Sequence, residues 1–286
     1  MTSSTVQPPS RRERVGAGAV QRFAITTLGR NFDDFTTEAS MPLRSAVNPL
    51  NGLPSIAPLA ILVDEIGGRV NYYRYRRPTV SSELSLTLSP GGLRSLAENP
   101  GEPVIAAGAP LGPAGTPMLS VCTLTHCGTI IGTGSVYTVA IQTDSSTRFD
   151  YSGAGVLAVE SDTVESLTDT ATGSLMAVEP LDEQDGSVAL RQHPDSGIYN
   201  SLGFVHGGVS SAGLEIAASA ALNRGQDPAF ATVSLRVSFL RPFAAGGESR
   251  YIGSTGRVGR TSATGEAKAI GADGKIAATA SLTAYR

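Results

Sequence analysis

Asn200-Ser-Leu-Gly-Phe-Val-His-Gly-Gly208, followed by the mostly apolar run 209–223, is the stretch that decides the fold. The glycines end a turn and begin a predicted helix, and Glu215 lies two turns inside it. Backbone N–H groups at a helix start have no intrahelical partner and carry positive partial charge. Because Gly207 and Gly208 have no side chain to cover these groups, the turn can hold an anion or a polarised carbonyl oxygen.

Composition indicates a globular protein without a strong electrostatic preference for nucleic acid or membrane, since the net charge of the 286 residues is −3. Two cysteines, Cys122 and Cys127, make neither a disulfide framework nor a metal site. No apolar run is long enough to span a bilayer. We therefore expect a cytoplasmic protein with no metal and no cofactor of its own.

A second helix is predicted over about 55–72, because Leu59, Leu62, Val63 and Ile66 recur with helical spacing. The alternating stretch 79–88 predicts a strand that stops before Pro90. Further strands are predicted in both halves of the chain, the last four after residue 230. The sequence therefore reads twice as a loop, a long helix and several strands.

The two halves can be aligned on matching residues. Three pairs lie 151 or 152 positions apart and two pairs lie 131 apart: Gly52 and Gly203, Asp64 and Glu215, Pro90 and Pro242, then Gly128 and Gly259, Gly134 and Gly265. The smaller spacing predicts extra residues in the first half. The Gly- and Pro-rich stretch 91–118 is expected to supply them as a surface excursion.

The chain is accordingly divided into four parts. These are a disordered tail over 1–20, a first unit over 21–145 that contains the insertion at about 91–118, a linker over 146–172, and a second unit over 173–286.

The motif Asn200-x-x-Gly-x-x-His-Gly-Gly208, with Glu215 and the later Val237-Ser-Phe-Leu-Arg-Pro242, resembles the hotdog-fold acyl-CoA thioesterases of the phenylacetyl-CoA and 4-hydroxybenzoyl-CoA type. The resemblance covers about 175–286 well and about 35–142 as a degraded copy. It implies an α+β double hotdog, with two antiparallel sheets each wrapped around a long central helix. The implied activity is hydrolysis of an acyl-CoA, with coenzyme A entering as part of the substrate.

In this family the site lies between two hotdog units. The resemblance implies that Gly207, with Gly208, polarises the thioester carbonyl and that Asn200 and His206 orient the thioester or the water. Asp64, from the first helix, would then be the base or nucleophile. Glu215 stays open as the working carboxylate if the site is assembled within one unit.

The first loop is expected to have lost the family's loop residues, because the positions matched to Asn200, His206, Gly207 and Gly208 are Pro49, Ser55, Ile56 and Ala57. The pocket that contains Glu215 would then be impaired or silent.

Coenzyme A needs phosphate contacts. The resemblance implies strand-edge contacts from the second unit, and it also gives Thr232 a polar position that helps to hold water. The candidate contact residues are Arg241, Arg257, Gly259, Arg260 and Thr261.

Each candidate residue also has a structural interpretation. Asp64 and Glu65 fit a solvated helix face, His206 fits a turn histidine, and isolated arginines are usually hydrated surface residues. A non-catalytic binder of acyl-CoA or acyl carrier is the main alternative function. A hotdog dehydratase would need a catalytic Asp and His pair, and this sequence contains no convincing one. A purely structural module would give no reason for a carboxylate in each long helix. The sequence gives neither the acyl preference nor the oligomeric state, although a homodimer of double hotdogs is compatible with it.

Overall fold

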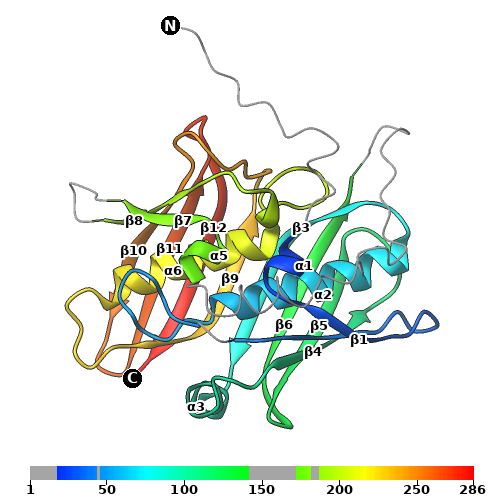
Figure 1. Ribbon diagram of the computed structural model, residues 1–286, viewed down its shortest axis with the longest axis horizontal. Coiled ribbons are helices and arrows are strands. Elements are labelled where there is room, and N and C mark those ends of the chain that lie inside the picture. The colour runs from blue at the N-terminus through cyan, green and yellow to red at the C-terminus, as the bar shows by residue number, and fades with distance from the viewer. Residues whose placement is uncertain (1–17, 44–45, 142–171, 182–186) are drawn as a thin grey trace, which may run out of the picture.

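The computed structural model of the protein describes residues 18–43, 46–141, 172–181 and 187–286 (Figure 1). The first half contains α1 (Ala19–Arg22), β1 (Thr26–Arg30), β2 (Thr37–Met41), α2 (Ala57–Tyr75), β3 (Thr79–Leu88), α3 (Pro90–Glu98), β4 (Val104–Leu111), β5 (Met118–His126) and β6 (Thr129–Ala140). The second half contains α5 (Thr172–Leu175), β7 (Val178–Leu181), β8 (Val188–Gln192), a 3-10 turn (Ser196–Ile198), α6 (Gly207–Asn223), β9 (Ala231–Phe239), β10 (Arg250–Val258), β11 (Ser262–Ile270) and β12 (Ile276–Tyr285).

The tail and the linker predicted from the sequence lie mostly outside the described residues. Of the tail, only residues 18–20 are described, and there Ala19 begins α1 and is buried, so the prediction of disorder is wrong for these residues. Of the linker, only Thr172 is described, and it begins α5.

Both long helices begin where the sequence predicts and end for local reasons. Pro58 lies in the first turn of α2, where its missing N–H is not needed. The helix ends at Arg76, which adopts a left-handed conformation (φ 57°) and donates its N–H to the Tyr72 carbonyl. His206 caps α6 by accepting the Gly208 N–H on its ring.

All strands of the described residues join one antiparallel sheet of 12 strands, in the order β1-β2-β4-β5-β6-β3-β9-β12-β11-β10-β8-β7. The prediction of two separate sheets is therefore wrong in this respect. β3 and β9 would be unprotected edges if each half stood alone, and instead they pair with each other from Glu83 opposite Ser238 to Thr87 opposite Ser234.

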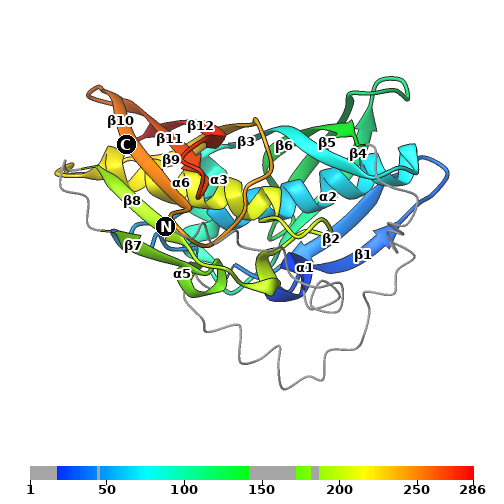
Figure 2. The same cartoon turned by 90° about the horizontal axis from the view of Figure 1, so that it is seen from above.

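The strand order reads the same from both ends when β1, β2, β4, β5, β6 and β3 are matched with β7, β8, β10, β11, β12 and β9. Figure 2 shows the middle strands on one side of α2 and α6 and the end strands curling beneath them. The two halves are thus related by an approximate two-fold axis between β3 and β9, and each half of the sheet packs on its own long helix.

The sequence allows a short helix near 92–98 within the predicted excursion over 91–118, and α3 lies there. The rest of the prediction is wrong, because the stretch also contains the sheet strand β4. The small residues that suggested a loop let α2 approach the strand closely. A Cβ added to Gly108 would lie 2.5 Å from the Ile66 side chain. The alignment of Gly128 with Gly259 is also wrong, since Gly128 lies between β5 and β6 and Gly259 between β10 and β11. The alignment of Gly134 with Gly265 is wrong for the same reason, since Gly134 lies in β6 and Gly265 in β11, the counterpart of β5.

The two long helices differ in how completely they are covered. α6 is buried without interruption from Gly208 to Leu222. α2 is also mostly buried, but Glu65, Gly68, Arg69 and Tyr72 are partly exposed, about one helical turn apart. We call this the open face of α2. Within the described residues, no helix is long and apolar enough to cross a membrane.

Candidate active site

The structure places Asp64 of α2 against the first turn of α6, the contact between the two halves on which the predicted composite site depends. The Gly208 N–H donates to Asp64 Oδ2 at 2.6 Å, and the Ser81 hydroxyl donates to Asp64 Oδ1 at 2.6 Å. Asp64 is only 5% exposed. The carboxylate therefore lies at the positive end of the partner helix with both oxygens hydrogen-bonded.

Glycine is required at both positions of this turn because α2 passes so close. A Cβ on Gly208 would lie 2.6 Å from the Ile61 Cα, and one on Gly207 would lie 2.7 Å from Asp64 Oδ2. Among the described residues, the Gly207 N–H has no hydrogen-bond acceptor. The two amides therefore differ, since the Gly208 amide holds the carboxylate and the Gly207 amide is left without an acceptor from the described residues.

His206 connects Asp64 to a second carboxylate, Glu65. Its Nδ1 lies 3.4 Å from Asp64 Oδ2, and its Nε2 lies 3.1 Å from Glu65 Oε2. Glu65 is held in turn by Arg69, with 2.5 Å between Oε1 and Nε. The sequence interpretation of Glu65 as a solvated helix residue is wrong, since the side chain is 12% exposed. The sequence analysis did not identify Ser81 as a site residue. The only indication of its role is its position in β3, beside the Asp64 carboxylate of α2.

Neighbouring charges govern the protonation of Glu65 and His206. Burial disfavours ionised Glu65, but the charge of Arg69 and the hydrogen bond and charge of His206 outweigh it and lower the pKa of Glu65 to about 2. Burial also disfavours charged His206, yet the hydrogen bond to Glu65 and the charges of Asp64 and Glu65 outweigh it and raise the pKa of His206. Glu65 thus raises the pKa of His206 and keeps a proton on Nε2, while Nδ1 of the neutral ring accepts the Gly208 N–H.

In the profile of kcat/KM against pH, Glu65→Gln should shift the limb that reports the ionisation of His206, and the shift should be towards lower pH. A negative neighbour stabilises the imidazolium, so removing its charge lowers the pKa of His206. The measurement is a profile of kcat/KM against pH for the wild type and the variant. Glu83→Gln, on the exposed part of β3, is the control and should leave the limb in place. A limb that stays in place in Glu65→Gln would show that Glu65 does not set the charge of His206.

A second carboxylate site lies across the approximate two-fold axis, where Glu215 of α6 meets the start of α2. The Ser55 hydroxyl donates to Glu215 Oε2 at 2.5 Å and accepts the Ala57 N–H at 3.1 Å, so it occupies the place of His206. Glu215 is fully buried, and burial raises its pKa against the opposing hydrogen bonds of Ser55, Thr232 and Ser219. The predicted water-holding residue Thr232 therefore belongs to this second site and is the counterpart of Ser81.

The expectation that the first loop has lost its asparagine is wrong. The Asn48 N–H donates to the Leu53 carbonyl as the Asn200 N–H does to the Phe204 carbonyl, so Asn48 is the counterpart and its loop is one residue longer. Asn48 Nδ2 donates to the Ile216 carbonyl and to Ser219 Oγ.

Asn200 holds its own turn. Its Oδ1 accepts the N–H groups of Leu202 and Phe204, which leaves Nδ2 as the donor of this side chain.

The residues predicted to contact coenzyme A lie elsewhere. The turn between β10 and β11, beyond the C-terminal end of α6, contains Gly259, Arg260 and Thr261. Arg257 is the second-to-last residue of β10. Thr255 bonds to the Ala221 carbonyl, and Ala221 is about 20 Å along α6 from Gly208. Arg241 faces Asp273, with 3.7 Å between Nη1 and Oδ2. The structure therefore does not bring these residues to Asp64.

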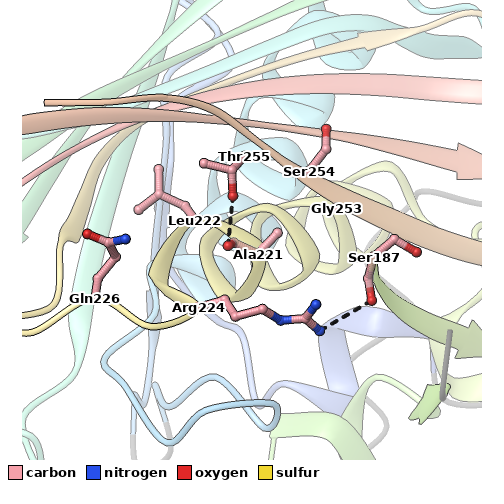
Figure 3. Close-up of a pocket in the computed structure, with 8 residues that line it drawn as sticks. All are labelled: Ser187, Ala221, Leu222, Arg224, Gln226, Gly253, Ser254 and Thr255. Carbon is pink, nitrogen blue, oxygen red and sulfur yellow. Dashed lines mark hydrogen bonds between the residues drawn. The ribbon is translucent and has the colours of Figure 1, made fainter. Parts of the chain in front are cut away.

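A hollow of about 400 Å³ lies at the same end of α6 (Figure 3). It is lined by Ser187, Ala221, Leu222, Arg224, Gln226, Gly253, Ser254 and Thr255. None of these residues carries a carboxylate, so the hollow differs in this respect from the surroundings of Asp64. The described residues also contain no cluster of three or more His, Cys, Asp or Glu side chains that could hold a metal ion.

Residues 202–278 match the family model of the Thioesterase superfamily. This match and the solved structures below confirm the resemblance to hotdog thioesterases that the motif predicts, including the tandem form. No curated protein sequence matches the chain.

Solved structures of similar fold span nearly the whole chain. The tesB protein MAP1729c of Mycobacterium avium subs paratuberculosis has 13% identity and a TM-score of 0.59, over 93% of this chain and 97% of that one. The acyl-CoA thioesterase II TesB2 of Mycobacterium marinum has 14% identity and a TM-score of 0.56, over 94% and 97%. A hot dog fold protein of unknown function from Alicyclobacillus acidocaldarius has 11% identity and a TM-score of 0.54, over 95% and 98%. At these identities the likeness concerns the fold.

Proposed function

We propose that this chain hydrolyses acyl-CoA thioesters to the free acid and coenzyme A. The observation that carries the proposal is the position of Asp64, 2.6 Å from the Gly208 amide and beside the Gly207 amide, which has no acceptor among the described residues. Thioester hydrolysis needs a carboxylate to activate water and a donor to stabilise the oxyanion, and this arrangement offers one of each. The thioesterase family match over 202–278 supports the same chemistry.

In the proposed reaction, Asp64 takes a proton from a water molecule whose oxygen attacks the thioester carbonyl carbon. The carbonyl oxygen gains the negative charge and accepts the Gly207 N–H. The tetrahedral intermediate then expels the thiolate, which takes up a proton, and the carboxylic acid is released. We assign Asp64 as base because hydrogen bonds hold both of its oxygens and fix it beside the amides. Direct attack by Asp64 would instead give an acyl anhydride on the enzyme.

Glu215 is a poorer candidate for the working carboxylate. It is fully buried, and burial raises its pKa, which disfavours the ionised form that a general base needs. At the Glu215 site, Ile56 and Ala57 occupy the positions that Gly207 and Gly208 occupy at the Asp64 site. Ile56 carries a buried side chain where Gly207 has none, and its backbone N–H is already bonded to Glu215. We therefore assign Glu215 a structural role between the helices.

Release of free thiol from a panel of short, long and aromatic acyl-CoAs tests the proposal. We expect catalytic turnover on at least one member, linear with protein concentration. The alternative is a non-catalytic binder of acyl-CoA or acyl carrier. It is supported by the Glu215 site, where the loop residues of the family are replaced by Ser55, Ile56 and Ala57. That protein would bind acyl-CoA with a measurable Kd and release no thiol from any member of the panel.

A further inference from the structure

The open face of α2 is a polar route out of the candidate site. His206, Glu65 and Arg69 follow one another outward from Asp64, with side chains 13%, 12% and 14% exposed. Arg69 also bonds to Thr27 Oγ1 of β1, on the exposed surface. Tyr72 continues this face one turn further along. Because α6 is buried from Gly208 to Leu222, the partly exposed residues of α2 are the part of the two long helices that reaches the surface next to Asp64.

Arginine and aromatic side chains gather where this route ends. We call five residues the arginine–aromatic patch: Arg30, Phe32, Tyr73, Arg76 and Arg77. Arg77 follows Arg76 in the chain, and its guanidinium lies 5.7 Å from the centroid of the Tyr75 ring. The Arg30 guanidinium lies 4.5 Å from the centroid of the Tyr73 ring and 5.5 Å from that of Phe32. The Arg76 guanidinium lies 5.7 Å from the Phe32 centroid. The Phe32 side chain is 50% exposed, and Arg76 and Arg77 are exposed.

Helix polarity explains part of the patch, since cations are favourable near the C-terminal end of a helix. It does not explain the exposed ring of Phe32, which comes from the loop after β1 and lies between two guanidinium groups. A guanidinium packed against a ring keeps its N–H edge available, and that edge matches the geometry of a phosphate. An exposed ring beside such groups can also stack on a nucleobase.

The distance from Asp64 to the patch matches the arm of coenzyme A. Thirteen bonds join the sulfur to the first phosphorus, and an extended chain at the rise of a peptide backbone spans about 15 Å over that many bonds. Asp64 and Arg76 are about 18 Å apart along α2, and the arginine side chain covers the remainder. The turn after β10 is farther, since Ala221 alone is about 20 Å from Gly208.

We propose that the arginine–aromatic patch binds the phosphate-bearing nucleotide end of coenzyme A, with the pantetheine arm along the open face of α2. The inference rests on the proposed function, because it names the part of the substrate that is recognised away from the reacting carbonyl. The arginines contact the phosphates, and the Phe32 ring contacts the adenine.

The variant Arg76→Asn/Arg77→Ala tests this assignment. Asparagine is chosen at position 76 because it tolerates the left-handed backbone there. We expect KM for an acyl-CoA to rise about tenfold with kcat unchanged, since each lost phosphate contact weakens binding of a remote part of the substrate. KM for the matching S-acyl-pantetheine, which lacks the nucleotide, should not change. Arg94→Ala/Arg236→Ala removes two exposed arginines elsewhere and serves as the control.

Direct binding keeps this test separate from the test of hydrolysis. Adenosine 3′,5′-bisphosphate titrated into the wild type by calorimetry should bind, and the Arg76→Asn/Arg77→Ala variant should lose most of that affinity. No binding to the wild type would overturn the inference even if acyl-CoA is hydrolysed. An equal rise in KM for both thioesters would overturn it as well, as would a loss of acyl-CoA affinity that follows Arg257→Ala/Arg260→Ala instead. A wild type that binds the nucleotide but releases no thiol would reject the proposed hydrolysis and leave the nucleotide site standing.

Discussion

Asp64→Asn is expected to lose about a thousandfold in kcat on the best acyl-CoA while remaining folded. Asparagine keeps an oxygen that can accept a hydrogen bond from Gly208 or Ser81, but it cannot take a proton from water. Loss of a general base typically removes a factor of about 10² to 10⁴. The measurement is steady-state thiol release, with circular dichroism and thermal unfolding to check the fold.

Glu215→Gln is the matched variant, because it makes the same change at the carboxyl across the approximate two-fold axis. We expect it to keep kcat within about threefold, since glutamine keeps an oxygen that can accept the Ser55 hydroxyl and Glu215 has no glycine amides beside it. Hydrolysis abolished by Glu215→Gln alone would mean that the composite assignment is wrong.

Gly208→Ala is expected to lower the free energy of unfolding by about 3 kcal/mol, near the upper end of what overpacking a buried contact costs. The added Cβ would lie 2.6 Å from the Ile61 Cα and 3.1 Å from the Ala60 carbonyl oxygen. Both are backbone atoms of α2, so the two helices must move apart. The same movement would take Asp64 from the Gly208 amide, and activity should fall with stability. Chemical denaturation of both proteins measures the difference.

Gly68→Ala is the control for this prediction. Gly68 lies inside α2, and a Cβ there meets no atom within 4 Å. Alanine should therefore stabilise the helix by up to about 1 kcal/mol through its higher helix propensity. If Gly208→Ala were as stable as Gly68→Ala, the close approach of α2 and α6 at Gly208 would be incorrect.

Several elements could be predicted because their signals are local. The spacing of Leu59, Leu62, Val63 and Ile66 gives α2, and the alternation of residues 79–88 gives β3 with the bounds that the structure has. The pairing of Asp64 with Glu215 also follows from the sequence, because both acids recur after similar loops. β4 could not be predicted in this way, since its small residues serve the close packing of α2 and resemble those of a loop.

The candidate site was predictable only in its parts. Asp64, His206, Gly207 and Gly208 are visible in the sequence, whereas Ser81 and Glu65 become candidates only when β3 and His206 are seen beside α2. The resemblance to the family pointed to the arginines at the end of β10. The structure places them near the C-terminal end of α6, whereas Asp64 lies at its N-terminal end.

By itself the sequence determined the repeated order of helix and strands, the glycine turn before α6 and the acid in each long helix, because periodicity, turn chemistry and spacing are properties of neighbouring residues. Only the tertiary structure decided that the two sheets join into one, that Asp64 meets the Gly208 amide while Glu215 meets Ser55, and that α2 alone keeps an open face. These depend on contacts between residues more than a hundred positions apart, and backbone pairing and close packing of whole elements set such contacts.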